Sequence, residues 1–132
     1  MKPPAMKPTA AIAQLRTTDL ARSIRFYVDV LGFDLVFEYR DFYAGLRAGT
    51  QMIHLKRVDR PDPSLTHVAE GEHLHLYLET SDAAALAAAI TAQGVGLVQP
   101  LHDTPWGTRE FVLRDDQGHT LRVGQILTVE AR

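Results

Sequence analysis

The sequence predicts an α+β fold made of two successive copies of one βαβββ module. In each half, a strand-like segment is followed after the same interval by a residue suited to begin a helix. Ile12 precedes Asp19 by seven residues, and His75 precedes Asp82 by seven. The two pairs lie 63 positions apart, and the glycines expected to end the two helices lie 62 apart. A repeated order of elements at a nearly constant interval indicates an internal duplication, so we expect two equivalent modules joined by a linker.

The first module is expected to begin with a strand over residues 11–17, AIAQLRT. Asp19 suits a helix N-cap, because its carboxylate can accept free backbone N–H groups. Gly32 suits the left-handed residue that ends a helix. Between them, apolar side chains recur at helical spacing: Leu20, Ile24, Tyr27, Val28 and Leu31. Three further strands, separated by turn-forming residues, complete the module: residues 34–39, 42–47 and 51–56.

A linker is predicted at residues 57–72, where proline, aspartate and glutamate occur without helical or strand-like periodicity. We therefore expect a single domain over residues 10–126, with modules at 10–56 and 73–126. The two ends are assigned to a flexible arm that contains three prolines and to a C-terminal tail, residues 1–9 and 127–132.

The second module repeats the order of the first. HLHLYLE (residues 73–79) alternates as a strand does, and Ser81 or Asp82 caps an alanine-rich helix that Gly94 ends. The expected helix and the strands after it cover residues 83–93, 96–101, 109–114 and 120–125. Asp115 and Asp116 fall in the turn between the last two strands, so we assign them to that turn and not to a catalytic dyad.

Composition excludes several function classes. The 132 residues are 45% hydrophobic and 23% charged, with a formal net charge of −2, so no basic stripe is present to neutralise nucleic-acid phosphates. There are no cysteines, which excludes disulfides and cysteine-ligated metals. The sequence contains no run of about 18 apolar residues that could span a membrane, and the N-terminal stretch lacks the apolar segment of a signal peptide. We expect a cytoplasmic protein.

Two stretches resemble signatures of one superfamily. LRTTDLARSIRFYVDVLGF (residues 15–33) is similar to the first strand–helix segment of the glyoxalase/bleomycin-resistance/dioxygenase superfamily, which has the vicinal oxygen chelate fold, and RDDQGHTLRVGQ (residues 114–125) resembles its closing hairpin. The resemblance covers about residues 10–126. It implies that the modules form incomplete barrels around a concave cavity and that two chains form a homodimer. The superfamily includes lyases, ring-cleaving dioxygenases, antibiotic-modifying transferases and drug-binding proteins, so the resemblance leaves the activity open.

Metal-dependent members of the superfamily place their ligands on the first and last strands of each module. By register, the resemblance carries these positions onto Ile12 and His54 in the first module and onto His75 and Arg122 in the second. The alternation of side chains along a strand predicts the same orientation without the resemblance. His54, His75 and Arg122 are each flanked by apolar residues that would face the helices, so these three side chains would face the cavity.

This set of residues is a poor fit to a divalent ion, so we expect no metal and no cofactor. Ile12 has no donor atom, and Arg122 stays charged at any working pH. A unit positive charge about 4 Å from a guanidinium costs about 4 kcal/mol at an effective dielectric of 20, and a dication costs more. A shifted set of ligands would still leave Arg122 nearby and is a minor alternative: Gln14, His54, His73 and His75.

Without a metal, the expected cavity has the composition of a small-molecule site, with an apolar and aromatic wall and a few hydrogen-bonding groups. The predicted ligand-binding residues are Ile12, Gln14, Met52, His54, Lys56, His73, His75, Tyr77, Trp106 and Arg122. Arg122 and Lys56 would favour a carboxylate, phosphate or enolate. We therefore expect a small organic molecule of anionic character as the partner, as in the metal-free members that resemble bleomycin-resistance proteins.

Three function hypotheses remain open on the sequence. The first is a homodimeric binding protein that holds a small molecule, for example to sequester an antibiotic. The second is a lyase, an isomerase or a dioxygenase-like enzyme acting on a carbonyl or enolisable substrate, with His54 or His75 as general base and Arg122 stabilising an oxyanion. The third is a structural or regulatory dimer.

Several of these residues also have a structural interpretation. Arg122 can form an ion pair with Glu79 or Glu110. An inward-facing strand histidine is more often hydrogen-bonded within the structure than a ligand. Trp106 can cap the core or a dimer interface as well as stack on a ligand. Tyr27 is expected in the core between helix and sheet.

Overall fold

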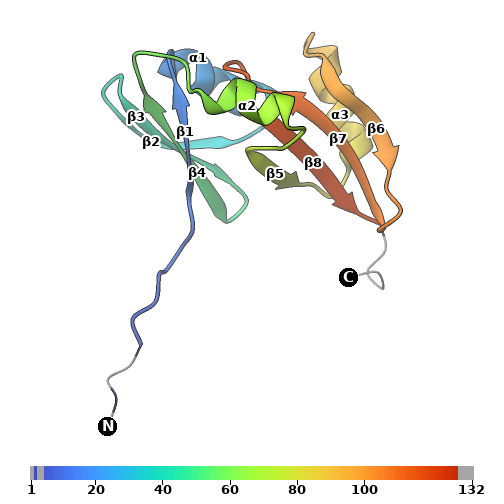
Figure 1. Ribbon diagram of the computed structural model, residues 1–132, viewed down its shortest axis with the longest axis horizontal. Helices are drawn as coiled ribbons and strands as arrows, with labels where there is room; N and C mark the ends of the chain where they lie inside the picture. Colours follow the sequence, from blue (N-terminus) through green and yellow to red (C-terminus); the bar gives the residue numbers. More distant parts are fainter. Residues whose placement is uncertain (1, 3–4, 128–132) are drawn as a thin grey trace.

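The protein contains two four-stranded sheets with helices between their strands, and this confirms the predicted pair of βαβββ modules (Figure 1). The computed structural model describes residue 2 and residues 5–127. Part of the predicted N-terminal arm and nearly all of the predicted C-terminal tail lie outside the described residues. The described residues before the first strand extend away from both sheets (Figure 1).

In the first sheet the strand order is β1-β4-β3-β2. β1 runs parallel to β4, and the other neighbours are antiparallel. The module consists of β1 (Ala13–Thr17), α1 (Leu20–Arg25), a π-helical continuation η1 (Phe26–Val30), β2 (Asp34–Tyr39), β3 (Tyr43–Ala48) and β4 (Gln51–Arg57).

The second sheet repeats this topology with the order β5-β8-β7-β6, in which β5 runs parallel to β8. The module consists of β5 (Leu76–Glu79), α3 (Ala83–Ala92), β6 (Leu97–Asp103), β7 (Thr108–Arg114) and β8 (Thr120–Ile126). The predicted caps are confirmed in both modules: Asp19 accepts the Arg22 N–H at 3.1 Å, and Asp82 accepts the Ala85 N–H at 3.0 Å.

Two predictions about the middle of the chain are wrong. The predicted linker contains a helix, α2 (Ser64–Glu70), none of whose residues is fully buried. Its apolar stripe is short, since only Leu65, Val68 and Ala69 recur at helical spacing and are half-buried. β5 begins at Leu76 and not at His73. The backbone N–H of His73 instead donates to the Val68 carbonyl, 3.0 Å away, so this residue lies in the segment that follows α2 and folds back onto its last turn.

One hydrophobic core lies between the helices and the outer faces of the two sheets. Alternate residues of the strands point into it, as strand geometry requires, and α1, η1 and α3 cover them. Its fully buried members include Leu20, Tyr27, Leu46, Leu55, Ile90, Phe111, Leu113, Leu121 and Val123. The opposite, inner faces of the sheets carry the polar candidates for the functional site.

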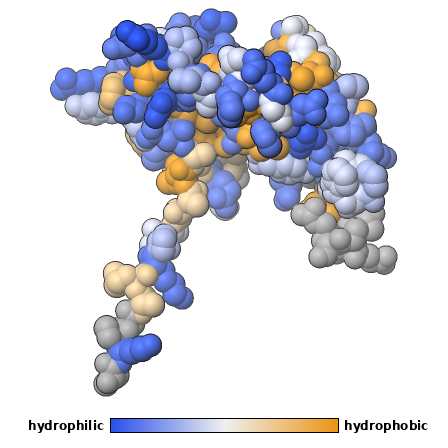
Figure 2. Space-filling model, in the orientation of Figure 1, coloured by the Kyte–Doolittle hydropathy of each residue, from blue (hydrophilic) through white to orange (hydrophobic). Residues whose placement is uncertain are grey.

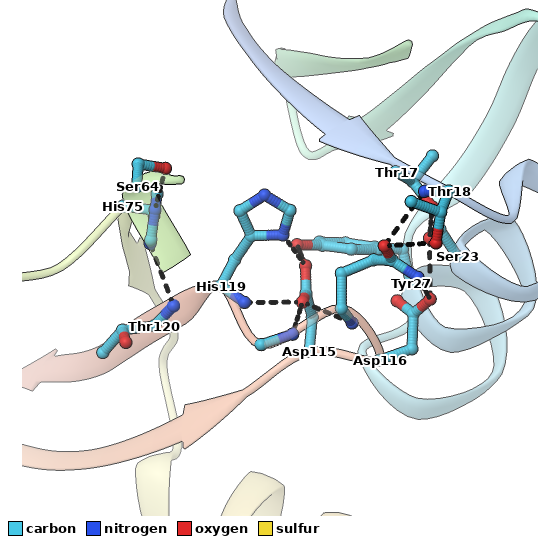
Figure 3. A network of polar contacts seen from close by, with 12 residues as sticks. Thr17, Thr18, Ser23, Tyr27, Ser64, His75, Asp115, Asp116, His119 and Thr120 are labelled. Atoms are coloured by element: carbon cyan, nitrogen blue, oxygen red, sulfur yellow. Dashed lines mark hydrogen bonds and ion pairs between the residues drawn. The ribbon is translucent and has the colours of Figure 1, made fainter. Parts of the chain in front are cut away.

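The β7–β8 turn joins the two modules through a buried carboxylate (Figure 3). Asp115 accepts hydrogen bonds of 2.7 Å from the Tyr27 hydroxyl and from His119 Nδ1. Its other oxygen accepts three backbone N–H groups of the turn at 2.8–3.0 Å. Next to it, the Ser23 hydroxyl donates to Asp116 at 2.7 Å. The aspartates therefore belong to the turn, as predicted, and they also attach that turn to the helix of the other module.

Burial raises the pKa of Asp115, but the hydrogen bonds from His119 and Tyr27 outweigh that effect and hold the pKa below its ordinary value. Burial, and then the charge of Asp115, raise the pKa of Tyr27 well above its ordinary value. The carboxylate is therefore ionised and the phenol neutral at neutral pH, which is the combination that gives a charge-assisted hydrogen bond.

We expect Tyr27→Phe to lower the free energy of unfolding by about 2 kcal/mol, because a buried hydrogen bond to a charged acceptor is lost. Urea unfolding measures the change. Tyr39→Phe is the matched control: the residue is 56% exposed, so its effect should stay within about 0.5 kcal/mol. Equal effects of the two changes would contradict the role assigned to Asp115.

Candidate functional site

The strand register determines which candidate residues lie side by side on the inner faces. In the first sheet Gln14 is the neighbour of His54. Ile12 lies just before β1 and is 43% exposed. In the second sheet Tyr77 is the neighbour of Arg122, and the His75 backbone bonds to Thr120. The resemblance implied that Ile12 lies beside His54 and that His75 lies beside Arg122. In both modules the actual neighbour is two positions later in the sequence, Gln14 in the first and Tyr77 in the second.

On the inner face of the first sheet, Tyr43 connects Gln14 to His54. The Gln14 side-chain amide donates to the Tyr43 hydroxyl at 3.0 Å, and that hydroxyl lies 2.9 Å from His54 Nδ1. The phenol oxygen can accept from Gln14 and still either donate to Nδ1 or accept from it, so this nitrogen of His54 is engaged in both tautomers of the ring.

Aromatic rings surround this chain of hydrogen bonds. The Phe37 ring is parallel to that of Tyr43, with centroids 6.3 Å apart, and meets His54 edge-on at 5.5 Å. Phe37 lies directly over Gly45, where a Cβ atom would come within 2.2 Å of the ring. Met52 and Lys56 lie on the same face of β4 as His54.

On the inner face of the second sheet, the buried carboxylate of Glu110 is bound by three side chains. It lies 3.1 Å from Arg122 Nη1, and it accepts from the Tyr77 hydroxyl at 2.8 Å and from the Thr108 hydroxyl at 3.0 Å. Burial raises the pKa of Glu110, but the hydrogen bonds from Tyr77, Thr108 and Arg122 outweigh it and lower the pKa below the ordinary value. Glu110 and Arg122 thus form an ionised pair whose charges cancel, which is one of the two pairings expected for this arginine.

A hollow of about 390 Å³ lies beside this pair, between the inner face of the second sheet and the end of α2. Its volume falls within the range of about 300–1,000 Å³ that is typical of small-molecule sites. Of the predicted ligand-binding residues, His73 and Arg122 line it. The other lining residues are Ala69, Glu72, Leu74, Val98, Gln99, Val112, Arg114 and Thr120.

His75 lies under the first turn of α2, and both of its ring nitrogens are occupied (Figure 3). The Thr120 backbone N–H donates to Nδ1 at 3.0 Å, so the ring proton is on Nε2, which lies 3.0 Å from the Ser64 hydroxyl. A histidine that activates a serine needs its lone pair on the nitrogen facing that hydroxyl. This pair has the opposite tautomer, so it is a structural contact between α2 and β8.

These donor sets do not fit a divalent ion. On the first sheet the amide of Gln14 lies beside the imidazole of His54, and on the second sheet the phenol of Tyr77 lies beside the guanidinium of Arg122. His54 Nδ1 is engaged by Tyr43, and the Glu110 carboxylate is engaged by Arg122. Within residues 5–127 no three histidine, aspartate or glutamate side chains converge as metal ligands would.

Sequence reasoning missed Tyr43, Ser64, Arg114 and His119. Alternation along β3 and β7 could have placed Tyr43 and Arg114 on the inner faces. Ser64 belongs to the helix that the sequence did not reveal. His119 is 1% exposed, and its Nε2 has no hydrogen-bond partner among the described residues. Trp106 is 60% exposed on the loop between β6 and β7, so it does not cap the core.

Gly45→Ala should lower the free energy of unfolding by about 1–3 kcal/mol, because the new methyl group displaces Phe37 from its packing over β3. Gly96→Ala provides the control, since no atom lies within 4 Å of a Cβ built there. Urea unfolding with an unchanged m-value tests the pair. A neutral Gly45→Ala would mean that Phe37 does not hold this position.

Solved structures with the same fold include both binding proteins and enzymes. TioX from Micromonospora sp. ML1 is 28% identical, with a TM-score of 0.73 over 91% of this chain and 100% of its own. The bleomycin-binding protein of Streptomyces verticillus, solved with copper(II)-bleomycin, is 25% identical, with a TM-score of 0.64 over 94% and 99%. Lactoylglutathione lyase from Agrobacterium tumefaciens, 22% identical with a TM-score of 0.67 over 90% and 95%, shares the fold. No curated protein matches the chain significantly.

The family model for the Glyoxalase/Bleomycin resistance protein/Dioxygenase superfamily matches residues 9–123. The match begins before β1 and ends inside β8, so it includes both modules. The chain therefore belongs to the glyoxalase/bleomycin-resistance/dioxygenase superfamily.

Proposed function

We propose that the protein binds a small organic molecule on the inner face of its second sheet, without a metal of its own, and that it serves to sequester an antibiotic-like compound in the cytoplasm. The observation that carries the proposal is the Glu110–Arg122 ion pair beside the hollow. The pair occupies the position where a metal-dependent relative would need free ligands, while the hollow offers apolar walls at Leu74, Val98 and Val112.

The enzyme alternative has less support. It requires His54 or His75 to act as general base, and a base needs a free lone pair within reach of the substrate proton. The lone pair of His75 is taken by the Thr120 N–H, and Nδ1 of His54 is engaged by the Tyr43 hydroxyl. Arg122, proposed to stabilise an oxyanion, already has its charge balanced by Glu110.

We propose Arg114 as the residue that favours an anionic ligand, in place of Arg122. Its side chain lies on the same face of β7 as Glu110 and borders the hollow. Within residues 5–127 it forms no ion pair, whereas Arg122 is bound to Glu110. An unpaired guanidinium can give a ligand carboxylate two parallel hydrogen bonds.

The relatives and the surface support the remaining parts of the proposal. The bleomycin-binding relative was solved with a copper-bound antibiotic. Apolar side chains are exposed where the N-terminal segment leaves the body (Figure 2) and along β2, at Leu35, Val36 and Phe37. Because large apolar patches usually mark contact surfaces, we propose that two chains form a homodimer. In residues 5–127 no helix is long and apolar enough to cross a membrane.

The test is an NMR titration of the ¹⁵N-labelled protein with 2-naphthoate and with its neutral isostere 2-naphthamide. We expect shifts at the residues that line the hollow, and a dissociation constant about tenfold lower for the acid, because a charge-assisted hydrogen bond adds about 1.5–3 kcal/mol. Arg114→Gln should abolish the preference for the acid. Arg25→Gln, which alters an exposed residue of α1, should leave it intact.

Absence of shifts at the hollow with both probes would contradict the binding site. Shifts with equal affinities for the two probes would refute only the role of Arg114. Sedimentation equilibrium on the same samples tests the homodimer, which a monomer mass at the NMR concentration would contradict.

A further inference from the structure

α2 is the most weakly attached helix of the described chain. None of its seven residues is buried, whereas α1 and α3 each bury residues in the core. Within residues 5–127, one side-chain hydrogen bond joins α2 to the sheets, from His75 Nε2 to the Ser64 hydroxyl. Elements with few buried contacts open at a lower free energy than the core does.

The same helix forms one side of the hollow. Ala69 lines it from the last turn of α2, and Glu72, His73 and Leu74 line it from the segment that follows. The opposite side consists of residues of β6, β7 and β8. In Figure 1, α2 crosses in front of β8, next to the start of β5. Movement of α2 away from the sheet would therefore widen the hollow.

We propose that α2 is a lid over this hollow and that His75 is its proton-sensitive latch, so that protonation of His75 releases α2. For its biological consequence, control of ligand release, the inference rests on the binding function proposed above. The opening of α2 itself requires no ligand, so it can be tested on the protein alone.

The hydrogen bonds of His75 explain why a proton would release it. Nδ1 accepts the backbone N–H of Thr120, and Nε2–H donates to Ser64. A proton added to Nδ1 would point at the Thr120 N–H, and two donors cannot form a hydrogen bond. The imidazolium must therefore turn away from Thr120, and the turn also moves Nε2 away from Ser64.

The charged groups around His75 come from three sides. The His119 ring from the β7–β8 connection meets it edge-on at 4.9 Å, with Asp115 behind that ring. Asp62 precedes α2, where it accepts the Ser64 N–H at 2.9 Å. The positive charge of Arg16 in β1 favours the ionised form of Asp62. Burial and then His119 lower the pKa of His75 below its ordinary value of 6.5, against the opposing effects of Asp115 and Asp62.

The direction of the pH effect follows from this shift. A histidine whose pKa is lowered in the closed state binds its proton more tightly in the open state. Closure is therefore fully favoured above about pH 6.5 and weakens as the pH falls. The pKa of Asp62 lies below its ordinary value of 3.8, so this carboxylate stays ionised down to about pH 5 and does not itself change the lid in that range.

Amide hydrogen exchange of the full chain without ligand, at pH 7.5 and pH 5.0, tests the inference. Protection factors, which correct for the intrinsic effect of pH, should fall roughly tenfold at residues 64–70, as expected for the loss of one or two hydrogen bonds. Residues of β7 and β8 should keep their protection and serve as the internal reference. Uniform loss over α2 and these strands would indicate global unfolding and overturn the lid.

Variants separate the latch from the other histidines. His75→Gln keeps one donor and one acceptor but cannot titrate, so α2 should stay protected at both pH values. His75→Phe lacks both bonds and should leave α2 unprotected at both. His67→Gln, on the exposed side of α2, should behave as the wild type.

A pH response that survives in His75→Gln, or that disappears in His119→Asn alone, would overturn the proposal. Because no ligand is used, failure of the binding proposal would leave these results unchanged.

Discussion

The Asp115 carboxylate is the contact on which the arrangement of the two modules depends. It accepts five hydrogen bonds, three from its own turn and one each from Tyr27 and His119. Tyr27 belongs to the helix of the first module, so the last hairpin of the second module is fixed against it. The same carboxylate holds His119, whose ring packs on His75 under α2. The position of one turn therefore connects the core to the edge of the proposed binding hollow.

The inner faces show how one fold can carry different chemistry. In each sheet a first strand runs beside a last strand, and the residues that meet there decide whether an ion can be held. Here Gln14 meets His54, and Tyr77 meets Arg122. A guanidinium next to a buried carboxylate forms a neutral pair, and a buried charge that is paired and hydrogen-bonded avoids most of the cost of desolvation. The second sheet thus satisfies its inner-face charges with its own residues, and the hollow beside this pair is the binding site that we propose.

The fold could be predicted because its signals are local. The caps at Asp19 and Asp82, the alternation of apolar residues and the nearly constant interval between the modules each follow from short stretches of sequence. α2 was missed because it has only seven residues, and its one apolar stripe, Leu65, Val68 and Ala69, lies in a stretch rich in proline and acidic residues. The site was harder still, because it depends on register between strands distant in sequence. Alternation turned His54 and Arg122 to the correct face, but it could not reveal that Gln14 and Tyr77 are their neighbours. Nor could it reveal that Thr120 engages the His75 lone pair, since that contact depends on how the strands align.

Elemental analysis of protein purified without chelator tests the central claim most directly. The Glu110–Arg122 pair, the engaged Nδ1 of His54 and the two engaged nitrogens of His75 predict only traces of metal, well below one ion per chain. One tightly held zinc, nickel, manganese or iron per chain would contradict the account, because these contacts leave no set of three free ligands among the described residues of the inner faces.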